Sequence, residues 1–275
     1  MALDFDLTEE QNLLRQAVRE FAEREIAPLA AALDEQEEFS VALTQKMGEL
    51  GLLGCLVPEK YGGSNMGYVS YIIAVEELAR VDASQAATIA AGNSLGIGPI
   101  YYYGTERQKQ EWLPRLCAGK ILAAFGLTEP NAGSDAGGSK TTAELKGDQW
   151  VINGTKIFIT NAANPLTGVI IVQAVTGRTA DGKPELSCII VPRDAAGFTA
   201  REMRKKMMWR ASNTGELVFE DCVVPRENLL GQRGDGFRQM LSTLDGGRLS
   251  IAAMGLGGAQ GAFDLALEYA NTRVQ

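Results

Sequence analysis

Apolar residues recur at helical spacing through the first 120 residues of the chain. Thr8 and Gln11 form a capping-box pattern ahead of the first run, and Pro28 is expected to end or kink that helix. Further helical runs cover residues 40–50, 68–81, 84–103 and 105–118. The pattern predicts an N-terminal helical domain over residues 1–119.

Between residues 120 and 234 the pattern changes to short apolar runs, most of them rich in β-branched residues, as is typical of strands. The runs are residues 121–128, 141–145, 149–152, 157–160, 169–175, 186–191 and 216–224. Turn-forming pairs separate several of them: Gly147 with Asp148, Asn153 with Gly154, and Asp181 with Gly182. This region is therefore predicted to be a middle antiparallel β domain.

Helical spacing returns from residue 235 and continues to the last residue without a cap. Gly255, Gly257, Gly258 and Gly261 favour close packing of this helix against another. We expect residues 235–275 to be the beginning of a C-terminal helical bundle domain that is incomplete in this chain. The predicted fold class is α+β, with a helical domain, an antiparallel β domain and the start of a helical bundle.

Composition narrows the function. The 275 residues carry a net charge of −8 without a basic block, which argues against nucleic-acid binding. No histidine is present, so His-based triads and His-ligated metal sites are excluded. The four cysteines form no Cys-x-x-Cys pair and are read as reduced thiols, and no metal is expected. No signal or transit peptide and no membrane-spanning run is visible, so a cytoplasmic location of bacterial type without membrane insertion is expected.

Two segments are candidates for ligand binding. In the first, Thr128–Asp135, Pro130 ends a strand, Gly133 permits close approach of a ligand, and Ser134 offers a hydroxyl group. Taken alone, this segment is more simply a polar turn between strands. In the second segment Phe158 precedes Thr160 on one strand, where an aromatic ring and a hydroxyl group could hold a planar cofactor. Its simpler interpretation is a core Phe in a sheet.

Both segments, in this order between two helical regions, resemble the flavin-contacting segments of the acyl-CoA dehydrogenase family. The resemblance covers the whole chain. The matching runs are Leu50–Gly54, Pro58–Gly63, Tyr103–Glu106, Leu113–Leu116, Leu127–Pro130, Ala132–Asp135, Asn153–Lys156, Ile159–Asn161, Trp209–Ser212, Phe219–Pro225 and Gly257–Gly261. Relative to the family, the chain is expected to be truncated at its C-terminus.

The resemblance implies FAD as the cofactor and assigns roles to individual residues. The residues implied to contact FAD are Phe125, Leu127, Thr128, Gly133, Ser134, Phe158, Ile159, Thr160, Arg273 and Gln275. Arg273 matches an arginine that reaches FAD of a neighbouring subunit, which implies a homo-oligomer, a homotetramer arranged as a dimer of dimers. The residues implied to contact the acyl-CoA substrate are Ser134, Asp245 and Arg248. Without the resemblance, Asp245 and Arg248 would be read as a surface ion pair, and Arg273 as an exposed charge.

The catalytic base is not visible in this sequence. Most relatives place a Glu in the last third of the C-terminal domain, beyond residue 275, and a minority place it where this chain has Gly247. Glu76, Glu77 and Glu129 are interpreted as structural. The chain also departs from the family at Met208, where Gly is usual, and at Asn213, where Asp is common.

The expected function is FAD-dependent α,β-dehydrogenation of an acyl-CoA thioester to the 2,3-enoyl-CoA, with electrons passed to an electron-transfer flavoprotein. An enoyl-CoA reductase and an acyl-CoA oxidase of the same fold are alternatives. A third alternative is a non-catalytic flavin- or CoA-binding fragment. The acyl group is not specified by the sequence; residues around 93–103, together with the C-terminal helices expected beyond residue 275, are expected to set the depth of its pocket.

Overall fold

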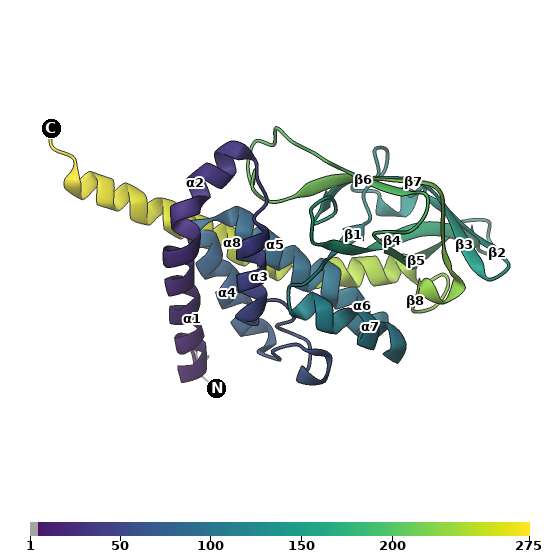
Figure 1. Ribbon diagram of the computed structural model, residues 1–275, viewed down its shortest axis with the longest axis horizontal. Helices are drawn as coiled ribbons and strands as arrows, with labels where there is room; N and C mark the ends of the chain where they lie inside the picture. Colours follow the sequence, from purple (N-terminus) through teal and green to yellow (C-terminus); the bar gives the residue numbers. More distant parts are fainter. Residues whose placement is uncertain (1–4) are drawn as a thin grey trace.

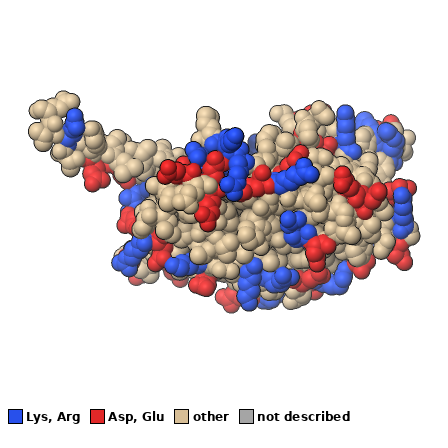
Figure 2. Space-filling model, turned by 45° about the horizontal axis from the view of Figure 1, so that its top comes forward, with Lys and Arg blue, Asp and Glu red and all other residues tan. Residues whose placement is uncertain are grey.

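The computed structural model describes residues 5–275 and arranges them as a helical layer, a β-sheet and one long terminal helix (Figure 1). Residues 1–4, at the start of the predicted helical domain, lie outside the described residues. The expected fold class, α+β with helices before and after a β domain, is confirmed. On the face shown in Figure 2, acidic and basic side chains are interspersed and form no continuous basic surface.

The helical layer begins at the predicted capping box, in which Thr8 and Gln11 bond each other's backbone amides. Pro28 does not end the helical run, because it lies in the first turn of α2, where a missing amide is tolerated. π-helical turns over Ala22–Ile26 and Gly92–Ile97 join α1 to α2 and α5 to α6. The helices are α1 (Glu9–Phe21), α2 (Ala27–Gln36), α3 (Val41–Glu49), α4 (Gly67–Val81), α5 (Ala83–Ala91), α6 (Gly98–Tyr103) and α7 (Glu106–Cys117).

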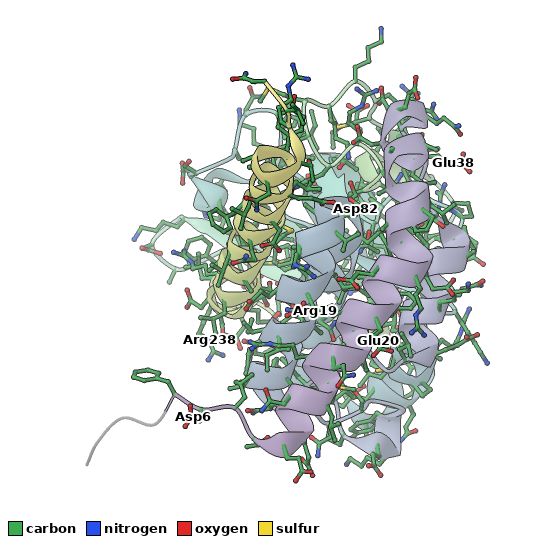
Figure 3. The ribbon with its side chains drawn as sticks, turned by 90° about the vertical axis from the view of Figure 1, so that its left-hand side faces the viewer. Asp6, Arg19, Glu20, Glu38, Asp82 and Arg238 are labelled. Carbon is green, nitrogen blue, oxygen red and sulfur yellow. The ribbon has the colours of Figure 1, made fainter. Side chains whose placement is uncertain are left out.

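Helix α4 lies at the centre of this layer and packs against α1, α5 and α8. Its buried Glu77 accepts two hydrogen bonds, both at 2.9 Å, from the guanidinium group of Arg19 on α1. Figure 3 labels Arg19, which lies between α1 and α4. A buried carboxylate needs such a partner, because an unpaired charge is expensive to remove from water. The interpretation of Glu77 as a structural residue agrees with this pairing.

The sheet has the order β6-β7-β3-β2-β4-β5-β8, with β1 paired to β4 off this path. Its pairs are antiparallel except those of β4 with β1 and β2, which are parallel. Sequence patterning did not indicate the short strands β6 and β8. The strands are β1 (Leu122–Gly126), β2 (Thr142–Lys146), β3 (Gln149–Thr160), β4 (Thr167–Arg178), β5 (Pro184–Pro192), β6 (Phe198–Glu202), β7 (Thr214–Pro225) and β8 (Leu229–Leu230).

The predicted turn at Asn153 and Gly154 is wrong, because both residues lie inside the continuous strand β3. The register against β7 shifts here, because the single residue Asn153 lies opposite both Glu220 and Asp221, and the Asp221 amide donates to the side-chain oxygen of Asn153 at 2.8 Å. Gly154 has a φ of +147°, and a Cβ atom at this position would lie 2.8 Å from the Cα atom of Thr141. Glycine is therefore required by this backbone conformation and by the close approach of Thr141, and not by a turn.

Helix α8 (Gly236–Thr272) starts against β5, crosses the helical layer beside α4, and projects beyond it (Figure 1). Gly257 and Gly261 face the backbone of α4 so closely that a Cβ atom would overlap the carbonyl oxygens of Glu76 and Arg80. Gly255 and Gly258 have no such neighbour, so only two of the four glycines serve the predicted close packing. No helix of residues 5–275 is long and apolar enough to cross a membrane.

Candidate functional site

The two segments singled out in the sequence meet around one small cavity. The backbone amide of Ile157 donates to the carbonyl oxygen of Thr128 at 2.9 Å, which joins the segment after β1 to the end of β3. The cavity has a volume of about 140 Å³. Its lining comprises Ala91, Leu95, Ala123, Phe125, Leu127, Thr128, Phe158, Ile159, Thr160 and Leu244. Six residues predicted to contact the cofactor are thus brought together.

Phe158 is not a core residue of the sheet. Its side chain is 63% exposed, and its backbone has a φ of +62°, in the left-handed region. This conformation occurs where the register of β3 against β7 shifts between Lys156 and Ile159. A bulky residue held there is strained by about 1–3 kcal/mol, and such strain is concentrated at functional sites. The bulge presents an aromatic ring at the mouth of the cavity, as contact with a planar ligand requires.

The loop after β1 places the other predicted residues differently. Gly133 and Ser134 are exposed and do not line this cavity. They also do not line the second, larger cavity that adjoins it and is described below. A Cβ atom at Gly133 would meet no atom within 4 Å, so packing within the described residues does not require glycine here. Both residues remain free to contact a ligand that extends out of the cavity.

A buried ion pair lies behind the cavity. The ammonium group of Lys156 is 2.7 Å from the carboxylate of Glu129, and the two side chains are 0% and 6% exposed. Burial opposes ionisation of Glu129 most strongly, but hydrogen bonds from Lys156, Ser139 and the amide of Lys140 together outweigh it and lower the pKa of Glu129 to about 2. Glu129 is therefore a charged structural residue, in agreement with its interpretation from sequence.

A second cavity of about 330 Å³ adjoins the first and shares Ala91, Leu95, Thr160 and Leu244 with it. Its other lining residues are Ala87, Ala90, Ser94, Trp209, Gly247, Arg248, Ser250 and Ile251. The walls are mostly apolar, and the volume is at the lower end of the usual range for ligand pockets, about 300–1,000 Å³. None of the described residues that line the two cavities is a carboxylate.

Of the predicted residues 93–103, Ser94 and Leu95 line the larger cavity, next to the alanines of α5. Residues Asn93, Gly98, Tyr102 and Tyr103 line a separate cavity between α4, α6 and α8. The π-helical turn at Gly92–Ile97 lies between the two cavities, and Ser94 borders both. The alanines of α5 and Leu244 of α8 were not identified from sequence, because short apolar side chains on distant helices carry no local signal of a cavity.

Asp245 and Arg248 pair with each other across one turn of α8, with 3.6 Å between the guanidinium nitrogen and the carboxylate oxygen. Both side chains are about three-quarters exposed, at 77% and 76%. Arg248 also lines the larger cavity, whereas Asp245 does not. Asp245 and Arg248 thus form an exposed ion pair on the surface of α8, and Arg248 also contributes to the wall of the larger cavity.

Arg273 and Gln275 are exposed and follow the end of α8, at the C-terminus marked in Figure 1. Neither is among the residues that line the two cavities. They do not reach the cavities of their own chain. The prediction that Arg273 contacts a cofactor in a neighbouring subunit stays a prediction.

Comparison with known proteins identifies the family. The N-terminal, middle and C-terminal domain models of acyl-CoA dehydrogenase match residues 8–120, 124–222 and 234–275. The probable acyl-CoA dehydrogenase YngJ of Bacillus subtilis is 51% identical over 99% of this chain and 71% of its own length. The short-chain specific acyl-CoA dehydrogenase of Clostridium acetobutylicum is 46% identical over the same shares.

Solved structures agree with this result. Butyryl-CoA dehydrogenase from Megasphaera elsdenii superposes with a TM-score of 0.93 at 42% identity, over 99% of this chain and 72% of that one. Chains of the same fold that are 35% and 39% identical were solved with FADH2 and FAD. The order of the domains, the joined cavities and these similarities lead to one conclusion: the chain belongs to the acyl-CoA dehydrogenase family.

Proposed function

We propose that this chain provides the flavin site and the acyl-binding cavity of an enzyme that converts a short acyl-CoA thioester to the 2,3-enoyl-CoA. An electron-transfer flavoprotein would accept the electrons. The observation that carries the proposal is the pair of joined cavities, bounded by the strained, exposed Phe158 on one side and by apolar helices on the other. Two of the relatives are named for short-chain or butyryl substrates, which supports a short acyl group.

The residues present fit FAD, the cofactor of this family. Phe158 supplies an exposed aromatic ring, and Leu127 and Ile159 supply apolar contacts at the small cavity. The hydroxyl groups of Thr128 and Thr160 border this cavity, and neither bonds to another described residue, so both can bond a polar ring edge. When bound, FAD would supply the redox chemistry by accepting two electrons from the substrate.

The larger cavity suits the acyl group of the substrate. Its walls are mostly alanine, leucine and isoleucine side chains, which suit an apolar chain, and Arg248 at the wall can bond a polar part of the thioester ligand. Ser134, exposed on the loop after β1, would contact the CoA chain outside the cavity. Thr160 borders both cavities and would therefore lie where substrate and cofactor meet.

Dehydrogenation also requires a group that accepts the α-proton. The described residues lining the two cavities supply no carboxylate, so the proposal needs a carboxylate from outside this lining. The same observation favours a second candidate function, a part of an acyl-CoA dehydrogenase that binds flavin and acyl-CoA without reacting alone.

One experiment separates the two candidates. The chain is loaded with FAD, and its visible spectrum is recorded before and after anaerobic addition of butyryl-CoA. Loss of the flavin absorbance would support the dehydrogenase and require a base within the preparation. Binding of FAD without bleaching would favour the binding function, and absence of FAD binding would contradict both. Fast reoxidation of a bleached sample by oxygen would instead favour an oxidase.

A further inference from the structure

The buried ion pair of Glu129 and Lys156 connects the two segments that border the small cavity. Glu129 lies one residue after Thr128, and Lys156 lies two residues before Phe158. The ammonium group of Lys156 donates to the Glu129 carboxylate at 2.7 Å and to the carbonyl oxygen of Leu127 at 3.1 Å. Neither Glu129 nor Lys156 lines a cavity, so both act on the site through the backbone on which they lie.

The same pair holds the far end of the loop. The Glu129 carboxylate accepts hydrogen bonds from the hydroxyl group of Ser139 at 2.5 Å and from the amides of Lys140 and Thr141 at 2.8 and 3.0 Å. The Ser139 hydroxyl is also 3.0 Å from the Lys156 ammonium. Both ends of the loop over residues 128–140 and the strand β3 therefore meet at one charged centre.

Stability of the protein core alone does not explain why Glu129 and Lys156 are charged. A buried ion pair gains little net stability, because the energy lost on removing two charges from water offsets their attraction. Its hydrogen bonds are directional, however, and several of them fix the relative position of backbone segments that side-chain packing alone leaves adjustable. The segments fixed here are those that carry Thr128 and Phe158.

We propose that Glu129 and Lys156 are positioning residues for the flavin, which hold the Thr128 backbone and the Phe158 bulge in register before the cofactor binds. The inference rests on the flavin site proposed above. It assigns a function in cofactor binding to two side chains that would not touch the cofactor. Preorganised segments bind more tightly, because binding then orders fewer groups.

The test uses three variants of the chain: Glu129→Gln, Lys156→Met and the double variant. Glu129→Gln keeps the shape and one acceptor oxygen but removes the charge, and the double variant has no buried charge left unpaired. Glu77→Gln is the control, since it removes the charge of another buried carboxylate, which lies in α4, lines neither cavity, and pairs with the partly exposed Arg19. Each variant is measured for its FAD dissociation constant, its melting temperature without FAD, and amide hydrogen exchange without FAD.

The proposal predicts that Glu129→Gln raises the FAD dissociation constant at least tenfold and speeds exchange of the amides of Lys140, Thr141 and Ile157. In the double variant the melting temperature should recover toward the wild-type value while the FAD affinity stays at least tenfold weaker. Glu77→Gln should lower the melting temperature without changing the FAD affinity more than twofold. If FAD affinity instead follows melting temperature across all four variants, the pair is only structural and the proposal is overturned.

Two further variants keep the test decisive. If Lys156→Met does not fold, Ser139→Ala takes its place, because this substitution removes the hydroxyl group that bridges the pair and leaves both charges in place. Ser139→Ala should weaken FAD binding about threefold. An unchanged FAD affinity would contradict the proposal. Phe158→Ala tests the flavin site itself. If Phe158→Ala leaves FAD affinity unchanged, the proposed site is wrong; if Phe158→Ala weakens binding but Glu129→Gln does not, only the positioning inference fails.

Discussion

The amide of Ile157 and the carbonyl oxygen of Thr128 are hydrogen-bonded at 2.9 Å, and this contact joins two parts of the chain that flank the small cavity. The bond lies one residue before Phe158, whose backbone leaves the regular strand conformation. The bulge that presents Phe158 is therefore anchored to the loop that presents Thr128. The shape of the cavity therefore depends on this contact between the end of β3 and the loop after β1.

Replacing Phe158 by glycine should separate stability from binding. Glycine adopts the left-handed backbone conformation without strain, so Phe158→Gly should stabilise the protein without FAD by about 1 kcal/mol, or roughly 2–4 °C in melting temperature. The loss of the exposed ring should raise the FAD dissociation constant at least tenfold. Thermal unfolding and quenching of flavin fluorescence measure the two effects. A variant that melts lower and binds FAD as tightly as before would show that Phe158 is a packing residue.

Filling the larger cavity should affect the substrate and not the cofactor. Ala87 lines the larger cavity only, so Ala87→Leu should narrow the acyl site while the flavin site keeps its shape. Binding of octanoyl-CoA should weaken at least tenfold, and binding of butyryl-CoA by a smaller factor, at unchanged FAD affinity. Calorimetric titration with the two thioesters gives both constants. Equal effects on both thioesters would place the acyl group elsewhere.

Acid should remove the stability contributed by Glu129. The pKa of this carboxyl is lowered from its ordinary 4.5 to about 2 in the folded protein, so between these values the folded state binds fewer protons than the unfolded state. The stability that the ionised carboxyl adds over the protonated one, on the order of a few kcal/mol, should be complete above pH 4.5 and be lost as the pH falls to about 2. Urea unfolding of wild type and Glu129→Gln across this range measures the difference. If the difference in unfolding free energy between wild type and Glu129→Gln does not change with pH, this prediction is wrong.

The glycines of α8 should differ sharply in their tolerance of alanine. Gly257→Ala should destabilise the chain by at least 2 kcal/mol, because its Cβ atom would collide with the backbone of α4. Gly255→Ala is the matched control, and it should stabilise the exposed helix by up to about 1 kcal/mol, the difference in helix propensity. Urea unfolding of both variants decides the point, and similar effects of the two substitutions would mean that α8 does not pack on α4 as described.

Local chemistry explains which elements could be predicted from the sequence. The helix starts at Thr8 and Thr105 were predicted correctly, because a capping box is complete within four residues. The turn at Asn153 was predicted wrongly, because its pairing with Asp221 depends on a strand nearly seventy residues away. The parallel pairing of β1 with β4 is equally non-local and has no signature in either strand.

The same distinction holds for the site. Thr128 and Thr160 could be identified because the segments around them resemble a known family, and the structure places both at one cavity. Ala91 and Leu244 close that cavity from α5 and α8, and nothing in their local sequence distinguishes them from ordinary core positions. The exposure of Phe158 was likewise not predictable, because it follows from a register shift against β7.

The most direct test of the account is a crystal structure of the chain with FAD bound. We expect the isoalloxazine ring in the small cavity, with Phe158 against the ring and the side chains of Thr128 and Thr160 within hydrogen-bond distance of its polar edge. The bulge at Phe158 and the Glu129–Lys156 pair should be unchanged from the structure described above. A flavin bound at any other surface, or a Phe158 side chain turned into the sheet, would contradict the proposed flavin site.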